Sequence, residues 1–396
     1  MESVNVTTSY DLHATSTNAS TVPDAALTDV ANRSWPIFFG DDFEDDVLFY
    51  TILHKVVVPV MFALIIGVGV VGNALVVYVT LTCRAMKTAV NLLLLNLAFS
   101  DILFLVVAVP FIAYHYAADN WMIGAVACKL SHFVLYATVY VTVYTLVAIA
   151  VVRFLSIVRS SPRPMPAPGR VAIVVVAVWI VMLAVNSPML AIYHVKEITV
   201  SPDMAPYHFC GPRDHRRYGP PMFISFFTLT YVVPLTIIVT MYLLIVRYLV
   251  ARRHRLALRT SEHGGAGGRL QRLQSRRASY AWRVFLAVVV VFGVCWLPMH
   301  THLLIAYLGL QPQNHAYAVF RVFCHCLAYS NSCANPFVYH YVSADFRRCL
   351  ADVVAGVTGY CRRRQPGRRR RERYTLDGSG TASQHDDVNT FDQRRY

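Results

Sequence analysis

Long apolar runs alternate with short polar segments from about residue 53 to residue 341 of the chain. A helix needs about 20 mostly apolar residues to cross the hydrocarbon core of a membrane, and each run is at least that long. Because lipid offers the backbone no hydrogen-bond partners, such runs fold as helices. The pattern predicts seven membrane-spanning helices, at about residues 53–81, 88–116, 125–157, 170–193, 220–249, 283–308 and 316–341.

The segments outside these runs are polar. We expect residues 1–50 to form an N-terminal tail, residues 51–342 the helical bundle and residues 357–396 a disordered tail. Residues 343–356 place Phe346 and Leu350 on one side of a helix, which is typical of a helix lying along a membrane surface. The predicted fold class is an all-α membrane protein, a seven-transmembrane helix bundle with a short amphipathic eighth helix.

Composition supports this class. The 396 residues are 56% hydrophobic and only 15% charged, which is unlike a soluble domain. The net charge is +14, but the basic residues gather in a few loops and in the tail, so they indicate topology and contact with anionic lipid rather than binding to nucleic acid. No short apolar run with a cleavage site opens the chain, and we therefore expect no removable signal peptide.

The positions of the basic residues predict the orientation. They follow the first, third and fifth spans and recur in the tail, so they fall on one side of the membrane. The positive-inside rule places this side in the cytoplasm and the N-terminus outside. Three glycosylation sequons, at Asn5, Asn18 and Asn32, independently favour an extracellular N-terminal tail. We expect a multi-pass protein of the plasma membrane.

Nine cysteines test this topology. Cys83, Cys349 and Cys361 fall on the cytoplasmic side, and four others lie within spans. Only Cys128 and Cys210 face the oxidising side, so we expect one disulfide, which would hold the second outer loop over the bundle. Cys361, which precedes three arginines, is the better candidate for palmitoylation, and Cys349 the weaker.

Polar residues inside the spans lie at matching depths. At the helical rise of 1.5 Å per residue, Asn73, Asp101 and Asn335 meet at one level, with Thr142 and Asn331 within reach. A carboxylate among amides and hydroxyls suits a small cation such as sodium. A purely structural hydrogen-bonded cluster is the alternative, and both can hold. We expect no other cofactor.

Several motifs resemble those of the rhodopsin-like G-protein-coupled receptors over about residues 50–355. They are Gly72-Asn73, Asn96–Asp101, Trp121, Cys128, Arg153-Phe154, Trp179, Pro234, Tyr242, Phe292 with Cys295–Pro298, and Asn335-Pro336-x-x-Tyr339. Within that family, the strings Val288–Gly293, Trp296–His300 and His325–Ser332 resemble the galanin and allatostatin-A neuropeptide receptors.

The resemblance implies a mechanism. A ligand at the outer mouth would shift Trp296 and Phe292 and swing the sixth span about its Pro298 kink. This movement would open an inner cavity for a heterotrimeric G protein, of the inhibitory Gi/o class in this branch. The resemblance assigns coupling and switch roles to Arg153, Tyr242, Phe292, Trp296, Pro298, Asn335, Pro336 and Tyr339.

One position departs from the family pattern. The family carries an acidic residue immediately before the arginine, and here that residue is Val152. Without a carboxylate partner, Arg153 loses a charge-assisted hydrogen bond that holds the resting state. The hypothesis that follows is raised basal signalling.

The outer halves of the spans are rich in aromatic and basic side chains and carry hardly an acid. Such a mouth suits an aromatic, amidated or acidic peptide end, with Arg321 holding a carbonyl or carboxylate. Many of these aromatics also fit an ordinary core or interfacial belt. The candidate ligand-binding residues are Phe111, His115, His132, Tyr136, Trp296, His300, Arg321 and His325.

Other classes are less consistent with the sequence. The third span has no acid between Cys128 and Arg153 to bind an amine, and the seventh has no lysine to hold retinal. A kisspeptin- or somatostatin-like peptide receptor is the nearest alternative, and a transporter, for which we find no internal repeat, is remote. We expect no enzymatic activity. The expected partners are an extracellular neuropeptide, a G protein, membrane lipid and, through phosphorylation of the tail, arrestin and receptor kinases.

Overall fold

The computed structural model describes residues 43–118, 120–158, 167–199, 206–262, 289–308, 310–312, 314–342 and 344–357. Residues up to Val353 form one compact unit, and a second unit begins at Val354. The three sequons, Cys361 and the tail phosphorylation sites lie outside the described residues.

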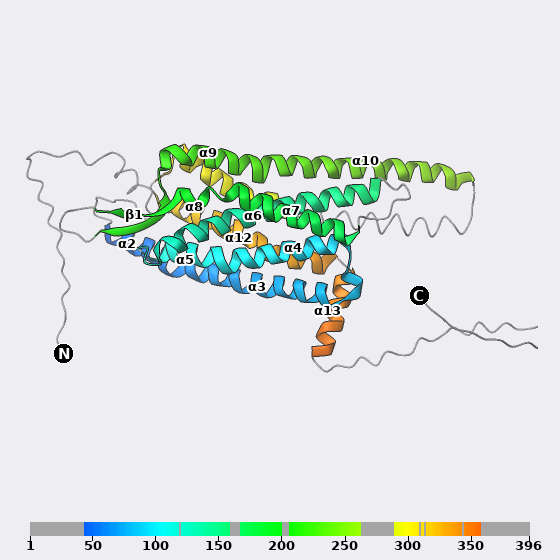
Figure 1. The fold of residues 1–396 in the computed structure, drawn as a ribbon, viewed down its shortest axis with the longest axis horizontal. Coiled ribbons are helices and arrows are strands. Elements are labelled where there is room, and N and C mark those ends of the chain that lie inside the picture. The colour runs from blue at the N-terminus through cyan, green and yellow to red at the C-terminus, as the bar shows by residue number, and fades with distance from the viewer. Residues whose placement is uncertain are drawn as a thin grey trace, which may run out of the picture. The chain divides into compact units, whose positions relative to one another are not determined.

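Helices dominate the described residues (Figure 1). The first four spans comprise α2 (Phe43–Ile52), η1 (Leu53–Val57) and α3 (Val58–Thr82); α4 (Ala89–Leu103), η3 (Phe104–Ala108) and α5 (Val109–Ala117); α6 (Gly124–Val158); and α7 (Pro168–Asn186) with α8 (Met189–Ile192). The others are α9 (His215–Phe227), η4 (Thr228–Val232) and α10 (Val233–Glu262); the helix Val289–Tyr307; α12 (His315–Val342); and α13 (Ala344–Val357). A short turn, η2 (Arg84–Met86), joins α3 to α4.

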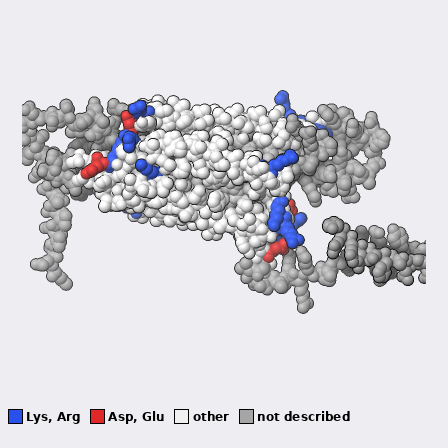
Figure 2. All heavy atoms as spheres, viewed as in Figure 1, with Lys and Arg blue, Asp and Glu red and all other residues white. Residues whose placement is uncertain are grey.

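Six of the described helices are long and apolar enough to cross a membrane. The seventh predicted span, α12, is 28 residues long but more polar. Its polar side chains Asn331, Ser332 and Asn335 are buried inside the bundle and so do not face lipid. A helix of this length can therefore cross the membrane although its mean hydropathy is lower. On the face shown in Figure 2, the charged side chains of the described residues lie at the two ends of the helices and not between them.

The first helix begins earlier than predicted. We expected a polar tail up to residue 50, but the structure is helical from Phe43. The side chain of Asp46 contacts His315 of α12 at 2.5 Å, and Phe49 stacks on the same imidazole with ring centroids 4.1 Å apart. These contacts pack α2 against α12, which composition did not reveal.

Three spans contain a widened π-helical turn immediately before a proline, at Pro59, Pro110 and Pro234. Proline has no N–H to donate to the preceding turn, and its ring crowds the carbonyl four residues earlier. The extra residue in each turn accommodates this crowding without ending the helix.

Close packing of α3 on α12 depends on glycine. A Cβ atom on Gly72 would lie 3.0 Å from Cγ and 3.2 Å from Cβ of Pro336. One on Gly69 would lie 2.4 Å from Leu105 and 3.0 Å from the Cys333 sulfur. The Gly72-Asn73 motif therefore lets the first and seventh spans approach closely.

Side-chain hydrogen bonds join the central spans. Nδ2 of Asn96 in α4 donates to Oγ1 of Thr145 in α6 at 2.8 Å, and Nε1 of Trp179 in α7 donates to Asn96 Oδ1 at 2.8 Å. In Figure 1, α3 and α4 run side by side, as their contacts confirm.

A two-stranded hairpin, absent from the all-α prediction, follows α8. β1 (Tyr193–Ile198) pairs antiparallel with β2 (Tyr207–Pro212), with Val195 opposite Cys210. The segment before α6 extends the pairing, because the Trp121 N–H donates to the His208 carbonyl at 2.9 Å and Asn120 Oδ1 accepts from the His208 N–H at 2.7 Å. The first and second loops at this end therefore form one layer.

The expectation of a single disulfide was wrong. Besides the predicted Cys128–Cys210 bond, Cys83 at the end of α3 is joined to Cys349 of α13. Both residues were expected to lie on the reducing side and to be unpaired. The fold brings their Cα atoms to 6.1 Å from each other.

Candidate functional site

A cavity of about 260 Å³ lies at the end of the bundle that carries the hairpin. Its walls come from α5, α6, β1, α9, α12 and the helix Val289–Tyr307. Seven of the eight candidate ligand-binding residues line it: Phe111, His115, His132, Tyr136, Trp296, Arg321 and His325.

His300 is not among the lining residues. Its side chain is buried, with its ring 5.4 Å from Phe226 and 4.9 Å from Tyr231. Neither ring nitrogen has a hydrogen-bond partner among the described residues. Phe226, which sequence reasoning did not single out, lines the cavity and contacts His300.

Arg321 is the only Lys or Arg, and no Asp or Glu appears, among the described residues that line the cavity. Its Nη2 lies 3.2 Å from Nε2 of His54, and its guanidinium lies 5.5 Å from the ring centre of Tyr116. Because arginine only donates, His54 accepts through Nε2 in this contact. Nε of Arg321 is buried without a hydrogen-bond partner in the described part of the chain.

Five aromatic lining residues were not among the candidate ligand-binding residues: Tyr116, Trp121, Tyr193, Phe226 and Tyr329. Tyr193 belongs to β1, and its hydroxyl lies 3.3 Å from that of Tyr136. Burial raises the pKa of Tyr193 well above its usual value, so it stays a neutral hydroxyl. The only feature of the sequence that could have identified Tyr193 as a lining residue is its position next to the loop that Cys210 anchors.

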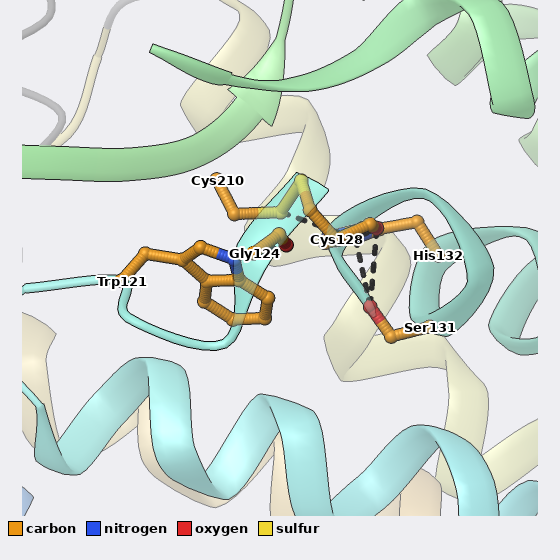
Figure 3. The surroundings of a disulfide bond; sticks show 6 residues. All are labelled: Trp121, Gly124, Cys128, Ser131, His132 and Cys210. Atoms are coloured by element: carbon orange, nitrogen blue, oxygen red, sulfur yellow. Dashed lines mark hydrogen bonds between the residues drawn. A yellow bond between two sulfur atoms is a disulfide. The ribbon is translucent and has the colours of Figure 1, made fainter. Parts of the chain in front are cut away.

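The predicted Cys128–Cys210 disulfide fixes β2 to the start of α6, with the two Cα atoms 5.7 Å apart (Figure 3). One turn further along α6, His132 contacts the Cys128 carbonyl through Nδ1 at 2.9 Å and stacks on the Tyr193 ring at 3.9 Å. Gly124 permits the entry into α6 because its φ of 87° lies in the left-handed region.

Cys128, His132 and Cys210 also bring three atoms of metal-binding type within 4.8 Å of one another. Both sulfur atoms are bonded in the disulfide, so neither is available as a thiolate ligand. This cluster is therefore structural.

A second polar site lies deeper in the bundle and centres on Asp101, which is 1% exposed. Its Oδ1 accepts from Ser332 Oγ and its Oδ2 accepts from Asn335 Nδ2, both at 2.8 Å. Nδ2 of Asn73 donates to the carbonyls of Ser332 and Gly69, at 2.9 and 2.8 Å. The meeting of Asn73, Asp101 and Asn335 predicted from helical rise is confirmed, whereas Ser332 was missed.

Thr142 and Asn331, the other predicted members, do not bond Asp101 directly. Thr142 Oγ1 lies 3.0 Å from the hydroxyl of Ser100, the neighbour of Asp101. Oδ1 of Asn331 is buried and has no hydrogen-bond partner among the described residues. A carboxylate, a hydroxyl and an unpaired amide oxygen are chemically suited to a sodium ion, while the direct bonds to Asp101 already form the structural cluster.

The predicted switch residues extend from the cavity to the opposite end. Trp296 lines the cavity and lies 6.0 Å from the Phe292 ring, and the carbonyl of Pro298 accepts from the Cys324 thiol at 3.3 Å. Tyr242 and Tyr339 are buried, and Tyr242 lies close enough to Arg153 for an electrostatic interaction.

Comparison with known proteins gives consistent matches. A model of the family described as "7 transmembrane receptor (rhodopsin family)" matches residues 72–339. The chain is 32% identical to rat (Rattus norvegicus) galanin receptor type 2 over 316 residues, covering 80% of each protein. It is 31% identical to the allatostatin-A receptor of Bombyx mori over 318 residues, covering 80% of this chain and 84% of that receptor. It is 32% identical to human galanin receptor type 1 over 330 residues, covering 81% and 88%.

The family match includes the Asp101 cluster and the switch residues from Arg153 to Tyr339. The three relatives match 80–81% of this chain and carry galanin or allatostatin-A receptor names. The chain belongs to the rhodopsin family of seven-transmembrane receptors, in the branch that contains the galanin and allatostatin-A receptors.

Proposed function

We propose that this protein is a plasma-membrane receptor for a neuropeptide of galanin-like or allatostatin-A-like type, which activates heterotrimeric G proteins of the Gi/o class. The names of its relatives support the ligand class. The orientation in this proposal has the N-terminus, the hairpin and the cavity outside the cell, as the basic loops and sequons favour.

The chemistry of the cavity wall carries the proposal. Histidine and aromatic rings surround a single arginine, and the lining contains no carboxylate among the described residues. An amine ligand would need a carboxylate counter-ion, whereas an aromatic peptide end with a carbonyl, carboxamide or carboxylate finds both stacking surfaces and a donor. Arg321 is the residue that would bind the polar group of that end.

Signal transmission follows from the contact between the cavity and the sixth helix. A ligand that displaces Trp296 also moves Phe292, because the two rings pack on the same helix. The ligand acts by preferring one packing of the bundle over the other. Arg153, Tyr242 and Tyr339 would line the inner cavity for the G protein, and sodium at Asp101 would favour the resting packing.

The remaining parts complete the proposal. α13 would lie along the inner membrane surface, Cys361 would carry palmitate, and the tail would recruit receptor kinases and arrestin. Glycans would occupy Asn5, Asn18 and Asn32.

A peptide panel tests this function. Membranes containing the full chain and Gi/o heterotrimers are exposed to galanin-like, allatostatin-A-like, kisspeptin-like and somatostatin-like peptides, and GTP exchange is measured. We expect a galanin-like or allatostatin-A-like peptide to raise exchange, and Arg321→Ala to weaken the response. A response only to another peptide class, or to none, contradicts the proposal.

A further inference from the structure

A covalent bond joins two segments at the end of the bundle opposite the cavity. Cys83 terminates α3, where its backbone N–H donates to the Val79 carbonyl at 3.0 Å. Cys349 lies in the first half of α13 and is 5% exposed. The two residues are separated by 266 positions in sequence, yet their Cα atoms lie 6.1 Å apart and their sulfur atoms are bonded.

The two disulfides of this protein cannot share a redox environment. Cys128 begins one membrane-crossing helix beside the hairpin, whereas Cys83 ends another at the far side of the bundle. A membrane around these helices therefore separates the two bonds into different compartments, of which only the exterior maintains disulfides permanently. With the cavity outside, which rests on the proposed function, Cys83–Cys349 faces the thiol pool of the cytosol.

We propose that Cys83 and Cys349 form a reversible thiol–disulfide modification site, which reacts with a low-molecular-weight disulfide of the oxidised glutathione class and latches α13 to the end of the first span. Neither residue belongs to the cavity, the Asp101 cluster or the proposed G-protein contact.

The reaction balances without another reagent. The thiolate of Cys83 attacks one sulfur of the small disulfide, forming a mixed disulfide and releasing one small thiol. The thiolate of Cys349 then attacks the Cys83 sulfur, closing the protein disulfide and releasing the second small thiol. Two protein thiols are oxidised by two electrons, the reagent is reduced to two thiols, and the two thiol protons pass to them.

Exposure assigns the order of attack. Cys83 is half-buried at the end of α3 and is accessible to a small reagent, whereas Cys349 is buried. Arg84 follows Cys83 and Arg348 precedes Cys349 in sequence, and positive charge near a thiol favours its reactive thiolate. An accessible first cysteine with a buried resolving partner is the arrangement of a redox-responsive pair.

The latch acts on the junction between α12 and α13. Phe346 is buried, and Nη1 of Arg347 donates to the carbonyls of His340 and Tyr341 at 3.0 and 2.6 Å. These contacts already hold the start of α13 beside the end of α12. A disulfide to Cys83 adds a covalent restraint between α13 and the end of α3, so the linked form resists movement of this end and signals less.

The full chain in cell membranes provides the test. Membranes are equilibrated with mixtures of reduced and oxidised glutathione, free thiols are blocked with N-ethylmaleimide, and the digest is analysed by mass spectrometry. We expect the Cys83–Cys349 peptide to increase about tenfold relative to the free thiols for each tenfold rise in the ratio of oxidised glutathione to the square of reduced glutathione. Cys83→Ser and Cys349→Ser abolish it, and the matched control Cys361→Ser retains it.

Signalling gives a second readout. Oxidation is expected to raise the peptide concentration for half-maximal GTP exchange about fivefold, the lower end of typical allosteric couplings, and the Cys83→Ser/Cys349→Ser double variant should not respond to it. Two free thiols in every mixture, or a bond that persists in fully reduced glutathione, overturns the inference.

The outcome is separable from that of the proposed function. Formation of the linked peptide is measured without any neuropeptide, so an inactive peptide panel leaves it intact. Labelling of Cys83 in intact cells by a membrane-impermeant maleimide would instead show that the proposed orientation, and with it the redox inference, is wrong.

Discussion

The Asp101 cluster and the cavity are both polar regions inside an apolar bundle, but they treat their polar groups differently. Both carboxylate oxygens of Asp101 accept hydrogen bonds from α12, and Asn73 adds a bond from α3. The atoms that this cluster leaves unpaired among the described residues are acceptors, Oδ1 of Asn73 and Oδ1 of Asn331. Around the cavity, Trp296 Nε1 and Arg321 Nε are buried without hydrogen-bond partners in the described structure, as are both ring nitrogens of the adjacent His300.

This difference indicates that the Asp101 cluster serves the packing of the helices and that the cavity serves ligand binding. Leaving a buried polar group unpaired costs about 1–3 kcal/mol, so a protein retains such groups where another molecule or another conformation supplies the partner. The cluster fixes how three helices pack, and the cavity keeps donors ready for a ligand.

The largest effect is expected for Asp101→Ala. It leaves Ser332 Oγ and Asn335 Nδ2 without acceptors, at about 1–3 kcal/mol each, so the melting temperature of the purified receptor should fall sharply. Asp101→Asn is the matched variant, because it keeps an acceptor oxygen while removing the charge, and it should lose less stability. If Asp101→Ala melts like the parent, the cluster does not hold the packing.

On the cavity side, Arg321→Ala should weaken binding of the activating peptide by about 10- to 100-fold, since hydrogen bonds to charged groups contribute about 1.5–3 kcal/mol. Radioligand competition measures the change. Arg217→Ala, which removes an exposed cation at the same end, is the control and should bind normally. Equal affinities for both variants would remove Arg321 from the ligand site.

Gly72→Ala tests the backbone approach that brings the cluster together. The new methyl would meet the Pro336 ring at 3.0 Å, and a proline within a packed helix cannot rotate away. We expect a loss of about 1–3 kcal/mol in stability, the usual effect of overpacking. Gly67→Ala has nothing within 4 Å of its new methyl and should be neutral or slightly stabilising, so equal melting of the two variants contradicts the argument.

The sequence predicted the depth of each polar residue better than the direction in which its side chain points, for a physical reason. Helical rise gives depth directly, so Asp101 and Asn335 were matched from counting residues. The rotation of each helix about its axis depends on side chains from its neighbours. Ser332 was missed on this account, and His300 packs against Phe226 instead of lining the cavity.

The ends of the bundle were hardest to predict. The hairpin consists of two six-residue strands whose partners include Asn120 and Trp121, and no local pattern reveals such pairing. Cys83 and Cys349 were left unpaired because compartment was used to decide pairing. The fold shows that proximity and compartment are separate questions.

A smaller effect is expected on basal activity, the GTP exchange measured without a ligand. In Val152→Asp, the new carboxylate next to Arg153 in the sequence adds a charge-assisted contact that favours the resting state, so ligand-free GTP exchange should fall by about fivefold, a coupling of about 1 kcal/mol. Val152→Asn adds a similar side chain without the charge and should change exchange little. Unchanged exchange in Val152→Asp would show that Arg153 does not depend on an acid here.

The smallest effect concerns the hairpin above the cavity. Partial burial, with the nearby charges of Lys196 and Arg213, lowers the pKa of His194 below its ordinary value of 6.5. A base with a lowered folded-state pKa takes up its proton more readily when unfolded, so stability is lost as pH falls below about 6.5 and is retained above it. Hydrogen exchange of the β1–β2 amides should therefore be faster at about pH 5.5 than at about pH 7.5, after correction for intrinsic exchange rates, and His194→Asn should reduce the difference. Because His194 lies in β1, the change should stay confined to the hairpin, and an equal acid effect on the α4–α6 core would show that another group is responsible.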